Sequence, residues 1–491
     1  MTPPNSAEPD TIADDVRTLQ KLGYSQELSR VLGGFSNFAV SLSIICILAG
    51  GLTSFHVGYC AAGGGGVAIG WIVMSILALA VAATMGQIAS AFPTAGGLYH
   101  WAAILGGRGW GWVTAWFNLL GLITVLAAIN VGTIQFATSG FFPNANLTPT
   151  VQLLAMTVIT STQAALNHRG VRITKVLTDF SGWWILGVAA VLTLVLLAYA
   201  PTWDWSRLIT FTNFSGLPEG DSSVWPRAES IAWVFALGLL LPAYTITGFD
   251  ASAHVAEETV HASAAVPRGI VRSVGVSGLF GLAMLAAIVL AMPDPAAAAN
   301  AGEKAFTNTL FAVVPKVLAY TLLAGCVLAQ YLCGLATITS ASRMAFAFAR
   351  DGGLPGSEWV RWVSPRYKSP PVAIWAVSVA AVLFTVYSSV YSTITAVCVI
   401  LLYVSYVLPT AAGLLSYGRT WKTFGPWHLG RWFRPLAFVS LTTCIGLMVI
   451  GMQPPNEKAL PAVSGTAIGL VVLWFTLARK RFPGPPKTQT V

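Results

Sequence analysis

A series of long apolar runs, separated by glycine, proline and charged residues, constrains this 491-residue chain more than any other feature. A helix of about 20 apolar residues crosses a hydrocarbon core of roughly 30 Å. One such run could form the core of a soluble protein, but a series of them predicts an all-α integral membrane protein. The twelve predicted spans are residues 34–62, 66–90, 109–138, 150–167, 173–200, 229–254, 269–292, 316–349, 370–388, 390–416, 434–453 and 460–478.

The low content of charged residues agrees with a membrane location. Only 9% of the residues are Asp, Glu, Lys or Arg, whereas soluble proteins carry about 25%. So few charges cannot cover a water-facing surface. The first residues are polar and include Glu8, Asp10 and Asp14, which is unlike a cleavable signal. We therefore expect a mature, cytosolic amino terminus.

The distribution of basic residues predicts the orientation. An even number of spans places both termini on one side, and that side holds 22 of the 27 Lys and Arg residues. Such a bias marks the cytoplasmic face. It predicts a multi-pass protein of the cell membrane with both termini cytoplasmic, and it explains the net charge of +9 without a nucleic-acid partner. The six cysteines lie in apolar segments without metal-ligand spacing, so we expect small core residues and no metal or cofactor.

Two spans contain clustered helix-breaking residues. The first has Gly50 and Gly51 followed by Thr53, and the sixth has Thr, Gly and Asp clustered within 245–250. Small residues also permit close helix packing, which is the simpler explanation for either cluster alone. The two spans nevertheless hold the same place in two five-span halves, as an inverted repeat requires. Broken helices would direct free N–H groups toward a carboxylate and free carbonyls toward an ammonium, which suits a zwitterion.

Four motifs occur in order along the chain. They are ASAFPTAGGLYHW at 89–101, GFDASAHVAEET at 248–259 with VPR at 266–268, SRM at 342–344 through ARDG at 349–352 with LP at 354–355, and LYVSYVLP at 402–409. With these motifs, nearly the whole chain resembles the amino acid-polyamine-organocation superfamily. It is similar in particular to the amino acid/choline branch, which includes GABA, choline and related amine permeases. The resemblance implies a five-plus-five inverted repeat with broken helices one and six, two accessory helices and a site at mid-membrane.

Together, the spans and the resemblance predict the domain organisation. The parts are a cytoplasmic amino tail (1–32), a first five-helix repeat (33–200), an extracellular loop (201–228), a second five-helix repeat (229–416), accessory helices eleven and twelve (417–480) and a cytoplasmic carboxyl tail (481–491). We expect both tails to be loosely ordered. Trp203, Trp205 and Trp225 of the outer loop fit an interfacial belt better than a lid.

The resemblance also assigns candidate site residues. Substrate-binding candidates are Ala49, Gly50, Gly51, Thr53, Asn118, Tyr244, Thr245, Thr247, Gly248 and Phe249. Coupling or gating candidates are Asp250, Glu257, Arg343, Thr337 and Ser340. Two departures put the usual proton-coupling device in doubt: Gln87 stands where the family often has Glu, and Ile185 stands where several proton-coupled relatives have Lys.

Each candidate has a structural alternative. Asp250, an ionisable group inside a span, could serve coupling or could cap the lower half of helix six. Tyr244 could gate the site or simply pack, and Asn118 could line the cavity or join two helices. Thr337 and Ser340 lie near the sodium position of sodium-coupled relatives, yet hydroxyls also bond their own backbone. The charges Glu257, Glu258, Arg268, Arg343 and Arg350 could pair and separate at an inner gate, or form a solvated loop face.

These features together predict a secondary transporter that works by alternating access. An enzyme is disfavoured because the sequence has no nucleophile–base pair, metal-ligand cluster or phosphate loop. A channel or a transport-derived sensor would share the fold. The scarcity of Lys and Arg inside the spans argues against a strongly anionic substrate. We expect a small amino acid or an amine such as GABA, with choline, ethanolamine or a polyamine as alternatives, and a proton, sodium or exchange as the driving force.

Overall fold

The computed structural model describes residues 9–143, 145, 147–220, 225–387, 391–454, 456–457 and 459–486. Within this part the chain is helical, and extended segments pair only at two isolated bridges. This confirms the all-α prediction. Parts of the predicted tails (1–8 and 487–491), of the outer loop (221–224) and the boundary between spans nine and ten (388–390) lie outside the described residues.

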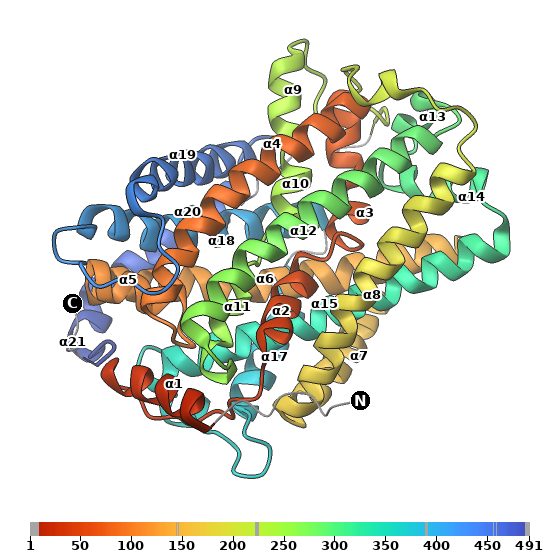
Figure 1. The fold of residues 1–491 in the computed structure, drawn as a ribbon. Helices are drawn as coiled ribbons and strands as arrows, with labels where there is room; N and C mark the ends of the chain where they lie inside the picture. Colours follow the sequence, from red (N-terminus) through yellow and green to blue (C-terminus); the bar gives the residue numbers. More distant parts are fainter. Residues whose placement is uncertain are drawn as a thin grey trace.

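The helices run back and forth along one bundle (Figure 1). The first half contains α1 (Pro9–Lys21), α2 (Gly34–Ile45), α3 (Gly50–Thr53), α4 (Phe55–Ala91), α5 (Leu98–Gly106), α6 (Arg108–Phe141), α7 (Pro149–His168) and α8 (Val171–Ala198). The second half contains α9 (Ile231–Gly238), α10 (Leu240–Thr245), α11 (Ala251–His254), α12 (Ala262–Ala291), α13 (Pro295–Asn300), α14 (Ala305–Val313), α15 (Lys316–Arg350), α16 (Ser357–Val360), α17 (Pro371–Tyr387) and α18 (Tyr391–Ser416). The chain ends with α19 (Phe433–Gly451), α20 (Ala459–Leu473) and α21 (Arg479–Arg481).

Many of these helices could cross a membrane, as the sequence predicts. Nine helices among the described residues are long and apolar enough to cross a membrane, and the segments Ile231–Thr245 and Pro371–Val386 are shorter apolar helices. Helix α7 has the length but carries the polar residues Gln152, Gln163 and Asn167. The total of twelve spans and the inverted repeat therefore stay predictions.

The outer loop packs on the end of the first span. Helix α4 is kinked at Gly63, where φ is +67°, so the predicted boundary between spans one and two coincides with a backbone bend. A Cβ on Gly64 would lie 2.3 Å from the carbonyl oxygen of Arg207, which shows how closely the loop approaches. Trp225 is only 4% exposed and donates its indole N–H to the Val57 carbonyl at 2.7 Å. The prediction of an interfacial belt is thus wrong for Trp225.

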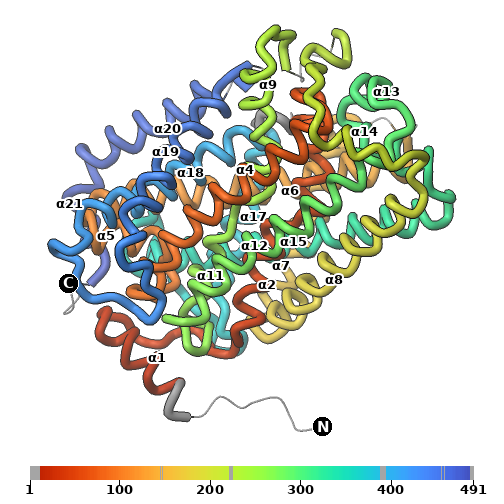
Figure 2. Tube along the Cα trace, turned by 45° about the horizontal axis from the view of Figure 1, so that its top comes forward, coloured from red at the N-terminus to blue at the C-terminus, as the bar shows by residue number. Residues whose placement is uncertain are grey.

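The tail segments within the described residues are packed, so the prediction of loosely ordered tails is wrong for them. Helix α1 lies across one end of the bundle, close to the carboxyl-terminal segment (Figure 2). Leu19 and Leu22 of the amino segment are buried, as is Phe482 near the other terminus. A Cβ on Gly23 would lie 2.5 Å from Cβ of Pro486. Apolar side chains in otherwise polar tails explain this packing.

Close helix packing depends on glycines that face large side chains. Trp71 of α4 is fully buried and donates its indole N–H to the carbonyl of Gly278 on α12 at 2.9 Å. A Cβ on Gly281, one turn further along α12, would lie 2.1 Å from Cζ2 of that indole. Since the Trp71 ring fills the space that a side chain would need, this contact fixes the distance between α4 and α12.

We expect Gly281→Val to lower stability by more than the roughly 1–3 kcal/mol typical of overpacking, because the rigid indole of Trp71 cannot give way. Gly187→Val on α8 is the matched control, since no atom lies within 4 Å of its added Cβ. Thermal unfolding in detergent measures both. Equal melting temperatures for the two variants would contradict the packing argument.

Candidate functional site

The first span is interrupted between α2 and α3. Its regular helix ends at Ile45, and Cys46 has φ +23°, which is incompatible with a continuing helix. Two side chains of α15 satisfy carbonyl groups near the interruption. The Gln330 amide donates to the Leu48 oxygen at 2.9 Å, and the Cys333 thiol donates to the Ile44 oxygen at 3.4 Å. Unwound backbone inside the bundle is therefore compensated by the neighbouring helix.

The sixth span is interrupted after α10. The Ile246 N–H still bonds the Pro242 carbonyl, but Gly248 then takes a φ of +82°, which L side chains rarely adopt. The Gly248 N–H donates to the hydroxyl oxygen of Tyr406 on α18 at 3.1 Å. The predicted breaks in spans one and six are both present.

The two interruptions lie against each other. A Cβ on Gly50 would lie 2.8 Å from Oγ1 of Thr245, and a Cβ on Gly248 would lie 2.4 Å from Cγ2 of Ile44. Close approach thus requires glycine at both positions, and at Gly248 the positive φ requires it as well. Two segments almost 200 residues apart in sequence form one irregular region inside the bundle.

A fully buried carboxylate follows the second interruption. Asp250 accepts hydrogen bonds from the Tyr406 hydroxyl at 2.7 Å and from the Asn118 amide at 3.1 Å. Its Oδ2 also lies 3.2 Å from Nε2 of His254, one turn further along α11. Asp250, His254 and Asn118 are 0% exposed. Such a set of donors offsets part of the large cost of removing a carboxylate from water.

His254 faces acceptors on both sides of its ring. Nδ1 lies 3.3 Å from the Ala95 carbonyl oxygen, and Nε2 lies beside Asp250. An ionised Asp250 next to a neutral His254 has only one ring N–H for these two contacts. One additional proton satisfies both, either as an imidazolium or as a protonated carboxyl that donates to Nε2. The His254 ring therefore links the Asp250 carboxylate to the Ala95 carbonyl.

Of the other predicted residues, two lie near Asp250, and three more have contacts of their own. Thr247 and Phe249 join the Asp250 region, with the Thr247 hydroxyl 3.5 Å from that of Tyr406 and the Phe249 ring centroid 5.1 Å from the Tyr406 ring. Tyr244 is buried on α10. The Thr337 hydroxyl donates to the carbonyl of Cys333 at 2.9 Å, as the alternative explanation for these hydroxyls supposed. The buried Ser340 hydroxyl has no hydrogen-bond partner among the described residues.

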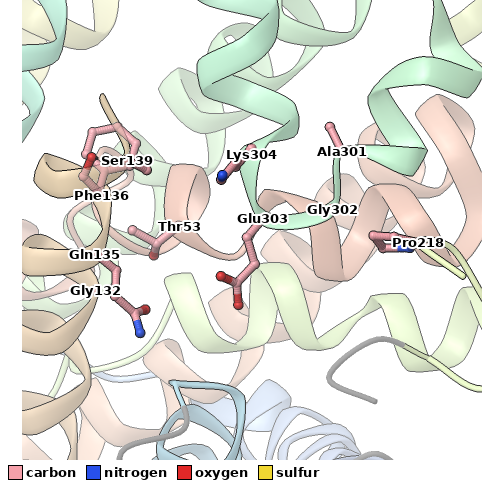
Figure 3. Close-up of a pocket in the computed structure, with 10 residues that line it drawn as sticks. All are labelled: Thr53, Gly132, Gln135, Phe136, Ser139, Pro218, Ala301, Gly302, Glu303 and Lys304. Atoms are coloured by element: carbon pink, nitrogen blue, oxygen red, sulfur yellow. Dashed lines mark hydrogen bonds between the residues drawn. The ribbon is translucent and has the colours of Figure 1, made fainter. Parts of the chain in front are cut away.

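A pocket of about 380 Å³ opens beyond the first interruption (Figure 3). Thr53 contributes from α3, and Gln135 contributes from α6. Glu303 and Lys304, which precede α14, bring one charge of each sign. Neither of them forms an ion pair within the described residues. Sequence reasoning missed these residues because they lie outside the predicted mid-membrane region.

Two buried ion pairs close the opposite end. Glu258 accepts from Arg343 of α15 at 3.0 Å, and Glu257 accepts from Arg350 of the same helix at 2.7 Å. Both glutamates are 0% exposed. The predicted opposite charges do pair, and a solvated loop face is thus excluded for these four. Arg268 is exposed and takes no part in these pairs.

Electrostatics favours the ionised form of Glu257. Burial acts to raise the pKa of this carboxyl, but the Arg350 guanidinium and the backbone N–H of Ala95 outweigh burial and hold the pKa below its usual range. The Ala95 N–H lies 3.1 Å from Oε1. Glu257 is therefore a charged partner at neutral pH.

The amino-terminal segment covers these ion pairs. The Tyr24 hydroxyl donates to Asp351 at 2.8 Å, and the Tyr99 hydroxyl donates to the same carboxylate oxygen at 2.7 Å. The Arg350 guanidinium lies 4.1 Å from the Tyr24 ring centroid. This part of the site could not be found from sequence, because the tail lacks a membrane span and its partners lie more than 70 residues away.

A bundle rich in membrane-length helices, with two apolar helices interrupted beside a buried carboxylate, is typical of the class of multi-pass membrane transporters built on broken helices. The family described as amino acid permease matches residues 32–477. The chain therefore belongs to the amino acid permease family, and its resemblance to the amino acid-polyamine-organocation superfamily is confirmed.

Similar proteins cover almost the whole chain. It is 31% identical over 510 residues to a protein of Arabidopsis thaliana named Amino-acid permease BAT1, with 95% of each chain covered. A protein of Oryza sativa subsp. japonica named Amino-acid permease BAT1 homolog is 31% identical over 509 residues, covering 95% of this chain and 94% of its own. Amino-acid permease 2 of Neurospora crassa is 27% identical, with 96% and 88% covered. These relatives are named as transporters rather than as enzymes.

We expect Arg343→Met to reduce the free energy of unfolding by about 3–5 kcal/mol, because it leaves the buried Glu258 carboxylate without its guanidinium. Arg361→Met is the control, since its ion pair with Glu358 is exposed and such pairs contribute about 0–1 kcal/mol. Unfolding titrations in mixed micelles measure both. The double variant Arg343→Met, Glu258→Leu should recover part of the loss, and equal losses for Arg343 and Arg361 variants would contradict the assignment.

Proposed function

We propose that this protein is a secondary active permease of the cell membrane that carries a small amino acid, or an amine such as GABA, by alternating access. The observation that carries the proposal is the contact between the two helix interruptions, where Gly50 meets Thr245 and Gly248 meets Ile44. A broken-helix pair in the middle of a bundle supplies backbone groups that a continuous helix cannot offer to a solute.

The chemistry of the interruptions supports a zwitterionic substrate. Among the described residues, the N–H groups of Ile47, Leu48 and Gly51 make no backbone hydrogen bond. They precede or begin α3, where the helix dipole is positive, and so they suit a carboxylate. An ammonium group would be held by carbonyl and hydroxyl oxygens near Thr245 and Thr247. On this proposal Ala49, Gly50, Gly51 and the segment 244–249 form the binding region.

The outer pocket supports the same substrate class. Its acidic Glu303 and basic Lys304 offer each end of a zwitterion an opposite charge (Figure 3). A volume of about 380 Å³ is sufficient for a small amino acid with some water. A solute would enter here, while the Glu257–Arg350 and Glu258–Arg343 pairs keep the opposite, cytoplasmic end closed. Separation of these pairs would then open the inner end.

The Asp250–His254 pair supports proton coupling. Asp250 lies two residues beyond Gly248, and both side chains of the pair are fully buried, so neither is exposed to solvent. A proton taken up by the pair on one side of the membrane and released on the other would link substrate movement to the proton gradient. Exchange of one substrate for another would need no such step.

A ligand panel tests the substrate class. We expect a small amino acid or GABA to raise the melting temperature of the purified protein, since a ligand of the folded state must stabilise it. Choline, ethanolamine and a polyamine complete the panel, and any hit is then measured as radiolabelled uptake into proteoliposomes. Stabilisation by the organic cations alone would replace the zwitterion assignment. No stabilisation by any compound, with the protein folded, would remove the support for amine transport.

Asp250→Asn tests proton coupling. We expect it to reduce uptake driven by a proton gradient at least about tenfold and to flatten the pH dependence of uptake between about pH 5 and 8, because the amide cannot take up the proton. Substrate exchange without a gradient should persist, which separates a coupling role from a loss of folding. Asp204→Asn in the exposed outer loop is the control. Unchanged gradient-driven uptake would exclude Asp250 from coupling.

A further inference from the structure

A second pocket, of about 360 Å³, lies between the starts of α2 and α12, at the end of the bundle that holds the termini. Gly34 and Phe38 of α2 form one wall, and Arg268 and Arg272 of α12 form part of the other. We propose that this pocket binds a phosphate-bearing anion, the headgroup of an anionic phospholipid. The site is separate from the interruptions and does not depend on the transport proposal.

The two arginines have no partner in the part of the chain that the structure describes. Neither Arg268 nor Arg272 forms an ion pair or a side-chain hydrogen bond among the described residues, and both are exposed. They lie four residues apart on one helix, so their side chains are neighbours on one face. Two guanidinium groups in such a position can hold one phosphate through several parallel N–H···O bonds.

Three carboxylates near this end are already occupied. Asp15 accepts from the backbone N–H groups of His261 and Ala262 at 2.7 and 3.1 Å, and it also faces Arg30. Glu257 and Glu258 are paired with other arginines, as described above. Among the described residues no acidic side chain lines the pocket, so its two arginines give it a net positive charge, which favours an external anion.

The pocket faces the lipid rather than the interior of the bundle. Leu279 is 68% exposed and lies seven residues after Arg272, on the same stripe of α12. Exposed aromatic rings border the other side, where Phe35 of α2 stacks on Trp183 of α8 at 5.2 Å between centroids. Aromatic side chains gather at the level of lipid headgroups. Arginines at that level attract anionic lipids.

The walls leave room for a headgroup beside the arginines. No atom lies within 4 Å of the position of a Cβ on Gly34, so the backbone of α2 is open there. One turn deeper, α2 and α12 close together, since a Cβ on Gly269 would lie 2.3 Å from Oδ1 of Asn37. The phosphate would thus stop at Arg268 and Arg272, and the acyl chains would follow the apolar stripe that includes Leu279.

Lipid retention tests the proposal. The protein is purified in mild detergent and incubated with phosphatidylglycerol, phosphatidylcholine or soluble glycerol phosphate; bound lipid is counted by native mass spectrometry, and the melting temperature is measured in parallel. We expect phosphatidylglycerol to be retained and to raise the melting temperature, with no such effect of phosphatidylcholine. Arg268→Gln, Arg272→Gln should lose at least one retained lipid, whereas Arg419→Gln, Lys422→Gln, an equal charge change at another exposed site, should not.

Each outcome of this experiment either supports the anion site or refutes it. Arg268→Lys, Arg272→Lys should keep part of the retention, because it preserves the charge and loses only the forked geometry. If soluble glycerol phosphate gives the same effect through the same arginines, the anion site stands and its source is soluble. If the glutamine variant remains folded and retains phosphatidylglycerol as the wild type does, the site is refuted. Equal loss in the control variant would show general charge attraction and would also refute it.

Discussion

Backbone hydrogen bonding inside an apolar bundle is the constraint on which the rest of this structure depends. A continuous helix satisfies its own N–H and C=O groups, but an interrupted one releases several of them where no lipid group can replace water. Gln330 and Cys333 on α15 donate hydrogen bonds to carbonyl groups at the first interruption, and the Tyr406 hydroxyl on α18 accepts one from the Gly248 N–H. On the proposed function, the N–H groups of Ile47, Leu48 and Gly51, which make no backbone hydrogen bond among the described residues, are the ones available to a solute.

The same constraint accounts for the position of Asp250. A carboxylate in the interior is tolerated because Tyr406 and Asn118 donate hydrogen bonds to it and the His254 ring lies beside it, and these side chains come from α18, α6 and α11. The cluster ties three helices to the lower edge of the second interruption. A change in the protonation of Asp250 and His254 would alter these hydrogen bonds and so would bias the helices that carry them. Coupling between a proton and a conformational change needs such a link.

The two ends of the bundle differ in construction. At the end covered by α1, two buried ion pairs to α15 and a packed amino segment fill the bundle. At the opposite end, the pocket lined by Thr53 also contains Glu303 and Lys304, which form no ion pair with any described residue. An asymmetric closure of this kind is what one state of an alternating-access cycle requires. On the lipid-site proposal, Arg268 and Arg272 of α12 add a contact with lipid beside α2, a half-helix next to the first interruption.

The sequence by itself determined the all-helical membrane class, the two interruptions and the family, because hydropathy, glycine clusters and ordered motifs are local properties of the chain. It also brought out Asp250 as an ionisable residue inside a span. Only the tertiary structure decided its partners: Tyr406 lies 156 residues away in sequence. The pairing of Glu257 with Arg350, the burial of Trp225 and the packed amino segment were likewise beyond local patterns. Each depends on which distant surfaces meet, and that is fixed by the packing of the whole bundle rather than by any one segment.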